Sequence, residues 1–145
     1  MANLKWNGPE FERRAQAHLR RNLSAACIAL VNYAKELLSV DGTGRAIAAH
    51  TARYGWGPKK KYRKKQMIYN FNPSAPGEPP HVQTGRLRGS VAWEVVGLLG
   101  RVGTNLRYGR WLELGAKKLA ARPWLRVSVA NMRAALIRII SRPMP

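Results

Sequence analysis

The N-terminal part of the chain carries one long stripe of apolar side chains. After Gly8-Pro9, apolar residues recur every three or four positions, which is the spacing of one face of an α-helix. The stripe consists of Phe11, Ala15, Leu19, Leu23, Ala26, Leu30, Tyr33 or Ala34, and Leu37. We predict a helix over residues 9–40, roughly 45 Å long at about 1.5 Å per residue. A helix of this length has one end that projects from the body or packs against a neighbouring subunit.

A second helical stripe covers the C-terminal end, and we predict a helix over residues 122–142. Pro123 suits the first position of a helix, because proline lacks the N–H that is unsatisfied there. The apolar positions that follow are Leu125, Val129, Met132, Leu136 and Ile139/Ile140.

Between these helices, residues 84–121 alternate short apolar runs with glycines. Residues 91–96 have the period of a strand, Leu98-Leu99 between Gly97 and Gly100 is the predicted turn, and residues 101–104 read as the return strand. A short helix follows, with Tyr108, Trp111 and Leu112 on one face and Gly115 as its left-handed stop. We expect residues 116–121 to form a third strand or an extended arm.

These elements predict a single α+β domain over residues 1–145. The two helices pack on one face of a small, mostly antiparallel sheet, and a neighbour completes its other face or edge. Residues 41–83 interrupt this pattern. They contain the basic run YGWGPKKKYRKK at 54–65 and four prolines in the nine residues 72–80, so we predict a long basic and proline-rich loop.

The charge of the chain narrows the choice of partners. Lys and Arg number 26 against seven Asp and Glu, a formal net charge of +19, which attracts polyanions. The loop also carries aromatic residues that can stack on bases. The alternative is a solvated charged loop. The candidate polyanion contacts are Lys59, Lys60, Lys61, Arg63, Lys64 and Lys65 in the loop, and Arg13, Arg14, Arg20 and Arg21 on the first helix.

Candidate chemistry is sparse. The carboxylates are scattered, and His18, His50 and His81 lie far apart in sequence, so no acid/base pair or metal-ligand spacing stands out. Neither of the glycine-rich motifs that bind phosphate groups, G-x-x-x-x-G-K and G-x-G-x-x-G, occurs in the sequence. We therefore predict no catalytic, metal or cofactor site and no enzymatic activity. No run of about 18 apolar residues predicts a membrane span, and Cys27 reads as a small core residue.

Four short motifs follow one another in residues 82–125: Thr84-Gly85-Arg86-Leu87-Arg88-Gly89-Ser90, then Val102-Gly103-Thr104, then Tyr108 with Leu112, Glu113 and Gly115, and finally Ala121-Arg122-Pro123-Trp124-Leu125. In this order and spacing, behind a long N-terminal helix, they resemble the tail-component, or tail-completion, proteins of long-tailed bacteriophages. Two positions depart from the family pattern. Gly109 stands where alanine is usual, and Gly115-Ala116 stands where Gly-Thr is usual.

The resemblance implies a structural virion protein at the head–tail junction, in the neck or in tail completion. It implies a homo-oligomeric ring around the DNA channel, with a hexamer favoured. It also implies contacts with other phage neck and tail proteins and assembly in the host bacterial cytoplasm. An alternative of another class stays open, namely a free basic nucleic-acid-binding protein that uses the Lys/Arg-rich loop.

Most motif residues read as fold-building. They are Thr84, Gly85, Leu87, Ser90, Tyr108, Trp111, Leu112, Gly115, Pro123, Trp124 and Leu125. The polar exceptions are Arg86, Arg88, Glu113 and Arg122, which we expect to form salt bridges within or between subunits. Glu113 can pair locally with Lys117.

Overall fold

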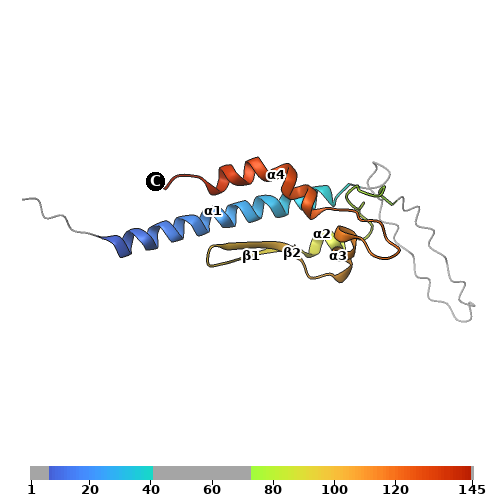
Figure 1. Cartoon of the computed structure of the whole chain (residues 1–145), viewed down its shortest axis with the longest axis horizontal. Helices are drawn as coiled ribbons and strands as arrows, with labels where there is room; N and C mark the ends of the chain where they lie inside the picture. Colours follow the sequence, from blue (N-terminus) through green and yellow to red (C-terminus); the bar gives the residue numbers. More distant parts are fainter. Residues whose placement is uncertain (1–6, 41–72, 145) are drawn as a thin grey trace, which may run out of the picture.

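The computed structural model describes residues 7–40 and 73–144 and has an α+β arrangement, as predicted (Figure 1). Its elements in chain order are α1 (Gly8–Leu37), α2 (Arg86–Ser90), β1 (Val91–Val96), β2 (Leu99–Thr104), α3 (Arg107–Leu114) and α4 (Leu125–Ile140). The predicted long helix and C-terminal helix are both present. The loop residues Lys59, Lys60, Lys61, Arg63, Lys64 and Lys65 lie outside the described residues.

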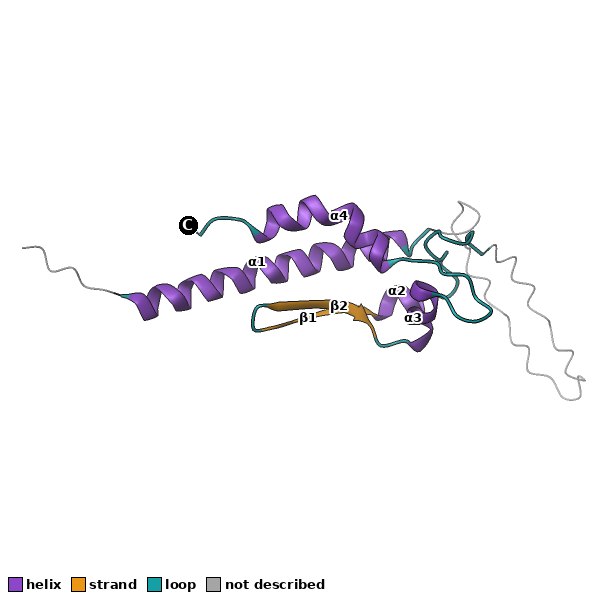
Figure 2. Ribbon diagram, viewed as in Figure 1, coloured by secondary structure: helices purple, strands orange, loops and turns teal. Residues whose placement is uncertain are grey.

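Helix α1 is the middle of three layers, with the β1–β2 hairpin on one side and α4 on the other (Figure 2). Helix α4 runs antiparallel to α1, because its middle bonds to Tyr33 through Asn131, and its end bonds to Asn22. Both helices therefore lie on the same side of the sheet, with α4 packed on the outer side of α1. Only α1 covers the hairpin, since α1 is apolar on two sides and can bury a partner on each.

The core lies where the C-terminal half of α1 meets α2, the start of β1 and the start of α4. Its buried members are Val31, Ala34, Leu38, Leu87, Val91 and Trp124, with Val102, Tyr108, Leu112 and Leu125 packed against them. The opposite end of α1 extends past both neighbouring layers (Figure 1), and Phe11 there is 63% exposed. The core thus packs against the C-terminal end of α1 and leaves its N-terminal end exposed.

The hairpin is a regular antiparallel pair in which Val91 lies opposite Thr104 and Val96 opposite Leu99. The turn is Gly97-Leu98 rather than the predicted Leu98-Leu99. Gly97 takes a positive φ of 62°, a conformation in which other residues are strained. Alternate residues face α1, and Gly100 lets β2 approach that helix closely, because a Cβ there would lie 2.7 Å from the Cys27 Sγ.

The predicted third strand at 116–121 is wrong. These residues form a tight turn that is closed by a bridge between Ala116 and Leu119, and the sheet of the described residues has two strands. Gly115 explains the difference, since its φ of 80° ends α3 and reverses the chain. A Cβ at Gly115 would also lie 3.1 Å from the Leu119 carbonyl oxygen.

Across residues 7–40 and 73–144, none of the helices combines the length and the hydropathy required to cross a membrane.

Candidate functional site: the Glu113 anchor and the motif groove

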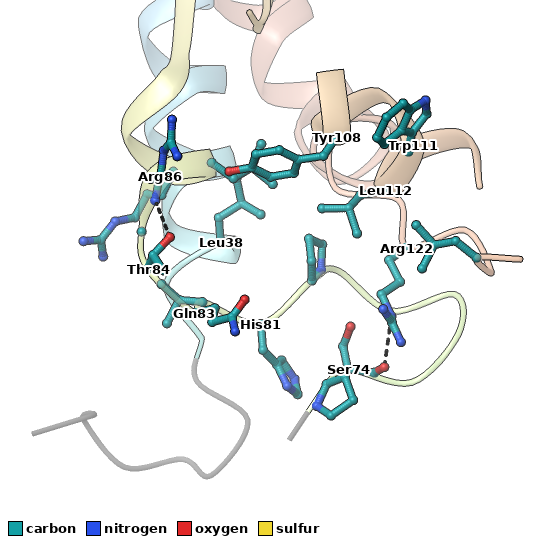
Figure 3. A pocket seen from close by; sticks show the side chains of 17 residues that line it. Leu38, Ser74, His81, Gln83, Thr84, Arg86, Tyr108, Trp111, Leu112 and Arg122 are labelled. Atoms are coloured by element: carbon teal, nitrogen blue, oxygen red, sulfur yellow. Dashed lines mark hydrogen bonds between the residues drawn. The ribbon is translucent and has the colours of Figure 1, made fainter. Parts of the chain in front are cut away.

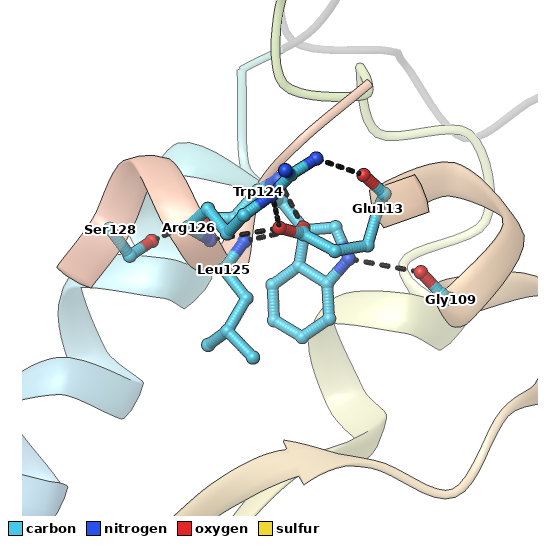
Figure 4. A network of polar contacts seen from close by, with 6 residues as sticks. All are labelled: Gly109, Glu113, Trp124, Leu125, Arg126 and Ser128. Carbon is cyan, nitrogen blue, oxygen red and sulfur yellow. Dashed lines mark hydrogen bonds and ion pairs between the residues drawn. The ribbon is translucent and has the colours of Figure 1, made fainter. Parts of the chain in front are cut away.

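Glu113 joins α3 to the first turn of α4 (Figure 4). Its Oε2 accepts hydrogen bonds from the backbone N–H groups of Trp124 and Leu125, both at 2.8 Å. Its Oε1 accepts from the Arg126 backbone N–H at 3.0 Å and from the Arg126 Nε at 3.1 Å. The first N–H groups of a helix have no partner inside the helix, and Trp124 offers no side-chain cap. Glu113 therefore supplies the cap from a different helix.

The protein environment acts on the Glu113 carboxyl in two opposing ways. Burial raises its pKa, because a charge is poorly solvated in the interior. Hydrogen bonds from the N–H groups of Leu125, Arg126 and Trp124 and from the Arg126 side chain favour the carboxylate, and the net result is a lowered pKa. The N-terminus of a helix also carries partial positive charge that favours an anion. Glu113, only 9% exposed, is held as a carboxylate.

The indole of Trp124 completes this anchor. Its Nε1 donates to the Gly109 carbonyl oxygen at 3.2 Å, and the Arg126 Nη2 donates to the Glu113 carbonyl oxygen at 2.9 Å. Gly109 suits the site because a Cβ there would lie 2.6 Å from the Thr104 Cγ2. This contact gives a physical reason for glycine at the position where the resembling family has alanine.

The anchor corrects two predictions. Glu113 forms its ion pair with Arg126 rather than with Lys117. Helix α4 begins at Leu125, two residues after Pro123, because the carboxylate of Glu113 fixes the first turn there. Glu113 therefore forms its ion pair with a residue of the same chain. The main role of its carboxylate is structural, as the acceptor for the N–H groups at the start of α4.

The other motif residues meet around a groove of about 520 Å³ beside the core (Figure 3). Arg86, Arg88 and Arg122 line it, so the three motif arginines are brought together although residue 122 is far from the others in sequence. The remaining motif residues in the lining are Thr84, Gly85, Leu87, Tyr108, Trp111 and Leu112. Among these arginines no ion pair with a carboxylate is present in the described residues.

Hydrogen bonds hold the rim of this groove in place. Arg122 Nε donates to the Ser74 carbonyl oxygen at 3.1 Å, and Arg88 Nη1 donates to the Ser39 Oγ at 3.1 Å. Thr84 does not cap α2 by the usual geometry. Its Oγ1 accepts from the Arg86 N–H at 3.4 Å, while Gly85 takes a φ of 72° at the cap position.

Ser90 and Ser74 play contrasting parts. Ser90, a predicted motif residue, donates to the Leu87 carbonyl oxygen at 2.7 Å and lies 2.6 Å from the Thr104 Oγ1, so it joins α2 to β2. Ser74, which no sequence pattern indicated, is 3% exposed and lines the groove. Within the described part of the chain its Oγ has no hydrogen-bond partner.

The basic candidates on α1 do not converge on the groove. Arg13, Arg14, Arg20 and Arg21 are all exposed on the half of α1 that extends past the core. Arg14 pairs with Glu10 at 2.6 Å within the same helix face. An exposed pair of this kind contributes little stability, so these side chains remain a basic surface.

Large apolar side chains gather on the outside of the hairpin and on α3. Val96 is 59% exposed, Leu98 56% and Leu99 53%. Trp111 and Leu114 on α3 are similarly exposed. Among the described strands, β1 and β2 pair only with each other, so each leaves an outer edge unpaired.

Over the ranges that the structure describes, no group of three or more His, Cys, Asp and Glu side chains could hold a metal ion. No protein-family model, curated protein or solved structure matches the chain.

Proposed function

We propose that this chain is a structural virion protein of a tailed bacteriophage that acts at the head–tail junction. In this proposal its copies form a ring, with a hexamer favoured, around the DNA channel. The order of the motifs from Thr84 to Leu125 supports the phage assignment by resemblance. The observation that carries the assembly role is the uncovered outer face of the hairpin.

Helix α1 covers the hairpin on one face, and unpaired strand edges readily pair with another chain. Here the outer face of the hairpin exposes Val96, Leu98 and Leu99 together. A cluster of this kind on a soluble protein marks an interaction surface. If a different surface of the next copy covers the hairpin, the contact repeats head to tail, and it forms a ring when the rotation between successive copies closes.

The basic surface of α1 fits the same proposal. Arg13, Arg20 and Arg21 are exposed on the projecting half of the helix. Arginines that line a channel would neutralise phosphates of the DNA that passes through it, without reading its sequence.

A Leu99→Lys variant tests the ring. Leu99 is exposed in the single chain, so the variant should fold normally, with an unchanged Tm, and fail to assemble. Ile137→Lys on α4 is the matched control, because Ile137 is exposed to a similar degree, at 57%. Each variant would be supplied to a phage that lacks the gene, and the particles would be counted by electron microscopy. We expect separate heads and tails with Leu99→Lys and joined particles with Ile137→Lys.

Normal head–tail joining in the complete absence of the gene would overturn the proposal. The net charge of +19 favours a second candidate, a free nucleic-acid-binding protein. That candidate predicts that the isolated chain binds duplex DNA with a steep salt dependence. It also predicts that neutralising Lys59, Lys60, Lys61, Lys64 and Lys65 abolishes this binding. Fluorescence anisotropy with a labelled duplex at several salt concentrations distinguishes the two.

A further inference from the structure

The motif groove combines an apolar floor with a basic rim. Leu38, Leu87, Tyr108 and Leu112 come from the core and form the floor, and prolines 73 and 80 stand at the side. Figure 3 shows Leu38, Tyr108 and Leu112 around one open space. Its volume of about 520 Å³ is within the range of ligand sites, which is about 300–1,000 Å³. The groove can therefore hold several side chains.

The charges of the lining have one sign. Arg86, Arg88 and Arg122 line the groove, and none of the lining residues is Asp or Glu. The contacts of Arg88 with Ser39 and of Arg122 with Ser74 orient two of the guanidinium groups. Each of these bonds uses one of the five N–H donors of a guanidinium, whose planar fork suits a carboxylate. The rim is thus complementary to an acidic occupant.

The hydroxyl of Ser74 gives a second, independent indication of an occupant. It is buried, lines the groove, and has no hydrogen-bond partner within the described residues. Figure 3 shows this side chain directed towards the middle of the groove. A buried hydroxyl without a partner is unfavourable, and the carbonyl or N–H of an extended peptide backbone would satisfy it.

We propose that the groove binds an extended segment of a partner protein that carries apolar side chains and at least one carboxylate. The apolar side chains occupy the floor, the carboxylate lies against Arg86 and its neighbours, and the backbone bonds to Ser74. This inference goes beyond the ring proposed above and does not depend on it. Helices α2 and α3, which contribute to the groove lining, lie at the opposite end of the hairpin from its tip (Figure 1).

Two other occupants fit less well. A second copy of the chain offers few carboxylates, because Glu113 is buried and Glu10 and Glu94 are in ion pairs. Among the described residues this leaves Glu12, Glu36 and Glu78. A nucleic acid strand needs cations that follow its phosphates and flat surfaces that stack on its bases. The groove lining has two aromatic side chains, Tyr108 and Trp111, but its apolar part is otherwise leucine, proline and valine.

A random dodecapeptide library selected on the full chain tests the proposal. The enriched peptides would be synthesised with a fluorescent label, and their affinities measured by anisotropy. We expect enrichment of sequences with Asp or Glu beside Leu, Ile or Phe. Arg86→Glu should weaken their binding at least tenfold, because the charge facing the carboxylate is reversed. Arg133→Glu, an equal charge change on the exposed surface of α4, should change it less than twofold.

Two further measurements separate binding from a structural role. Ser74→Ala should leave the Tm unchanged or raise it, since the hydroxyl has no partner in the unbound chain. The same change should weaken the peptide about fivefold, the typical effect of one hydrogen bond. A peptide whose carboxylates are replaced by lysine should bind Arg86→Glu better than it binds the unaltered chain.

Several outcomes would overturn the proposal. If Arg86→Glu and Arg133→Glu weakened peptide binding equally, the peptides would be attracted to the positive charge of the whole protein and not to the groove. Enrichment of peptides that match the hairpin tip, residues 96–99, would assign the groove to a second copy. A third outcome is that a single-stranded oligonucleotide displaces the peptides and that Arg86→Glu abolishes binding of the oligonucleotide. This outcome would assign the groove to nucleic acid.

Discussion

Removal of the Glu113 carboxylate is the sharpest perturbation of this fold. Glu113→Ala leaves the backbone N–H groups of Trp124, Leu125 and Arg126 without their acceptor at the start of α4. It also removes the ion pair with Arg126. Glu113→Gln keeps one side-chain oxygen as an acceptor but loses the charge. Both variants therefore act on the joint between α3 and α4, with a graded effect.

The expected magnitude follows from three contributions. Loss of an N-terminal cap costs about 1 kcal/mol, and loss of an anion at a partly buried helix N-terminus costs up to about 2 kcal/mol. Removing one member of a buried charged network costs about 3–5 kcal/mol. Because the Arg126 side chain is 65% exposed, its charge stays solvated and the lower end applies. We expect a loss of about 3 kcal/mol for Glu113→Ala and about 2 kcal/mol for Glu113→Gln.

Urea unfolding followed by far-UV circular dichroism and by tryptophan fluorescence measures these losses. In thermal unfolding, the Tm of Glu113→Ala should be roughly 6–12 °C below that of the unaltered chain. Glu94→Gln is the matched control, because Glu94 is also in an ion pair with an arginine but is largely exposed. Its effect should stay below about 0.5 kcal/mol. Equal stability of Glu113→Gln and the unaltered chain at neutral pH would refute the reasoning.

Acid provides a second test of the same carboxylate. The pKa of Glu113 is lowered in the folded chain from its ordinary value of 4.5, so the folded state binds the proton more weakly than the unfolded state does. The stabilisation is therefore complete above about pH 5 and is lost as the pH falls below 4.5 through the folded pKa. The stability difference between the unaltered chain and Glu113→Gln should shrink across this range. A difference that is constant from pH 7 to pH 3 would contradict the assignment.

Three further predictions concern the contacts of α1. Gly100→Ala should destabilise the chain by about 1–3 kcal/mol in urea unfolding, because its Cβ would overlap the Cys27 Sγ. Gly103→Ala is the control and should leave the stability unchanged, because a Cβ at Gly103 meets nothing within 4 Å. Burial raises the pKa of the Cys27 thiol, so the thiol should react slowly with a thiol reagent at pH 8 in the folded chain and rapidly in urea. Rapid reaction without urea would show that the Cys27 thiol is not buried. Asn22→Ala should cost about 1–2 kcal/mol, because Asn22 Nδ2 donates to two carbonyl oxygens at the end of α4; an unchanged urea midpoint would show that water replaces these bonds.

The sequence was sufficient to predict α1, α3, α4 and the hairpin. A stripe that repeats every three or four residues over a long segment has few alternatives to a helix, and α1 covers Gly8–Leu37 where 9–40 was predicted. The alternation of residues 91–96 and the glycine at 97 likewise specify a hairpin. Both signals are local, and here the tertiary contacts agree with them.

The candidate site was predictable only in part. Arg86, Arg88 and Arg122 stood out as polar residues in a packing motif, and they do line one groove. Ser74 had no signal, because its burial depends on a bond between its own carbonyl and Arg122, which lies 48 residues away. The third strand was predicted from composition, but the positive φ of Gly115 turns the chain instead.

The sequence alone determined α1, α3, α4 and the β1–β2 hairpin, and it placed the positive charge, because helical and strand periods depend on neighbours a few residues apart. Tertiary structure decided where α4 begins, which partner Glu113 takes, and on which side of α1 each layer lies. A carboxylate on α3 can cap α4 only after the chain between them has folded back, and no local pattern encodes that approach. The same folding brings the motif arginines and Ser74 around one groove.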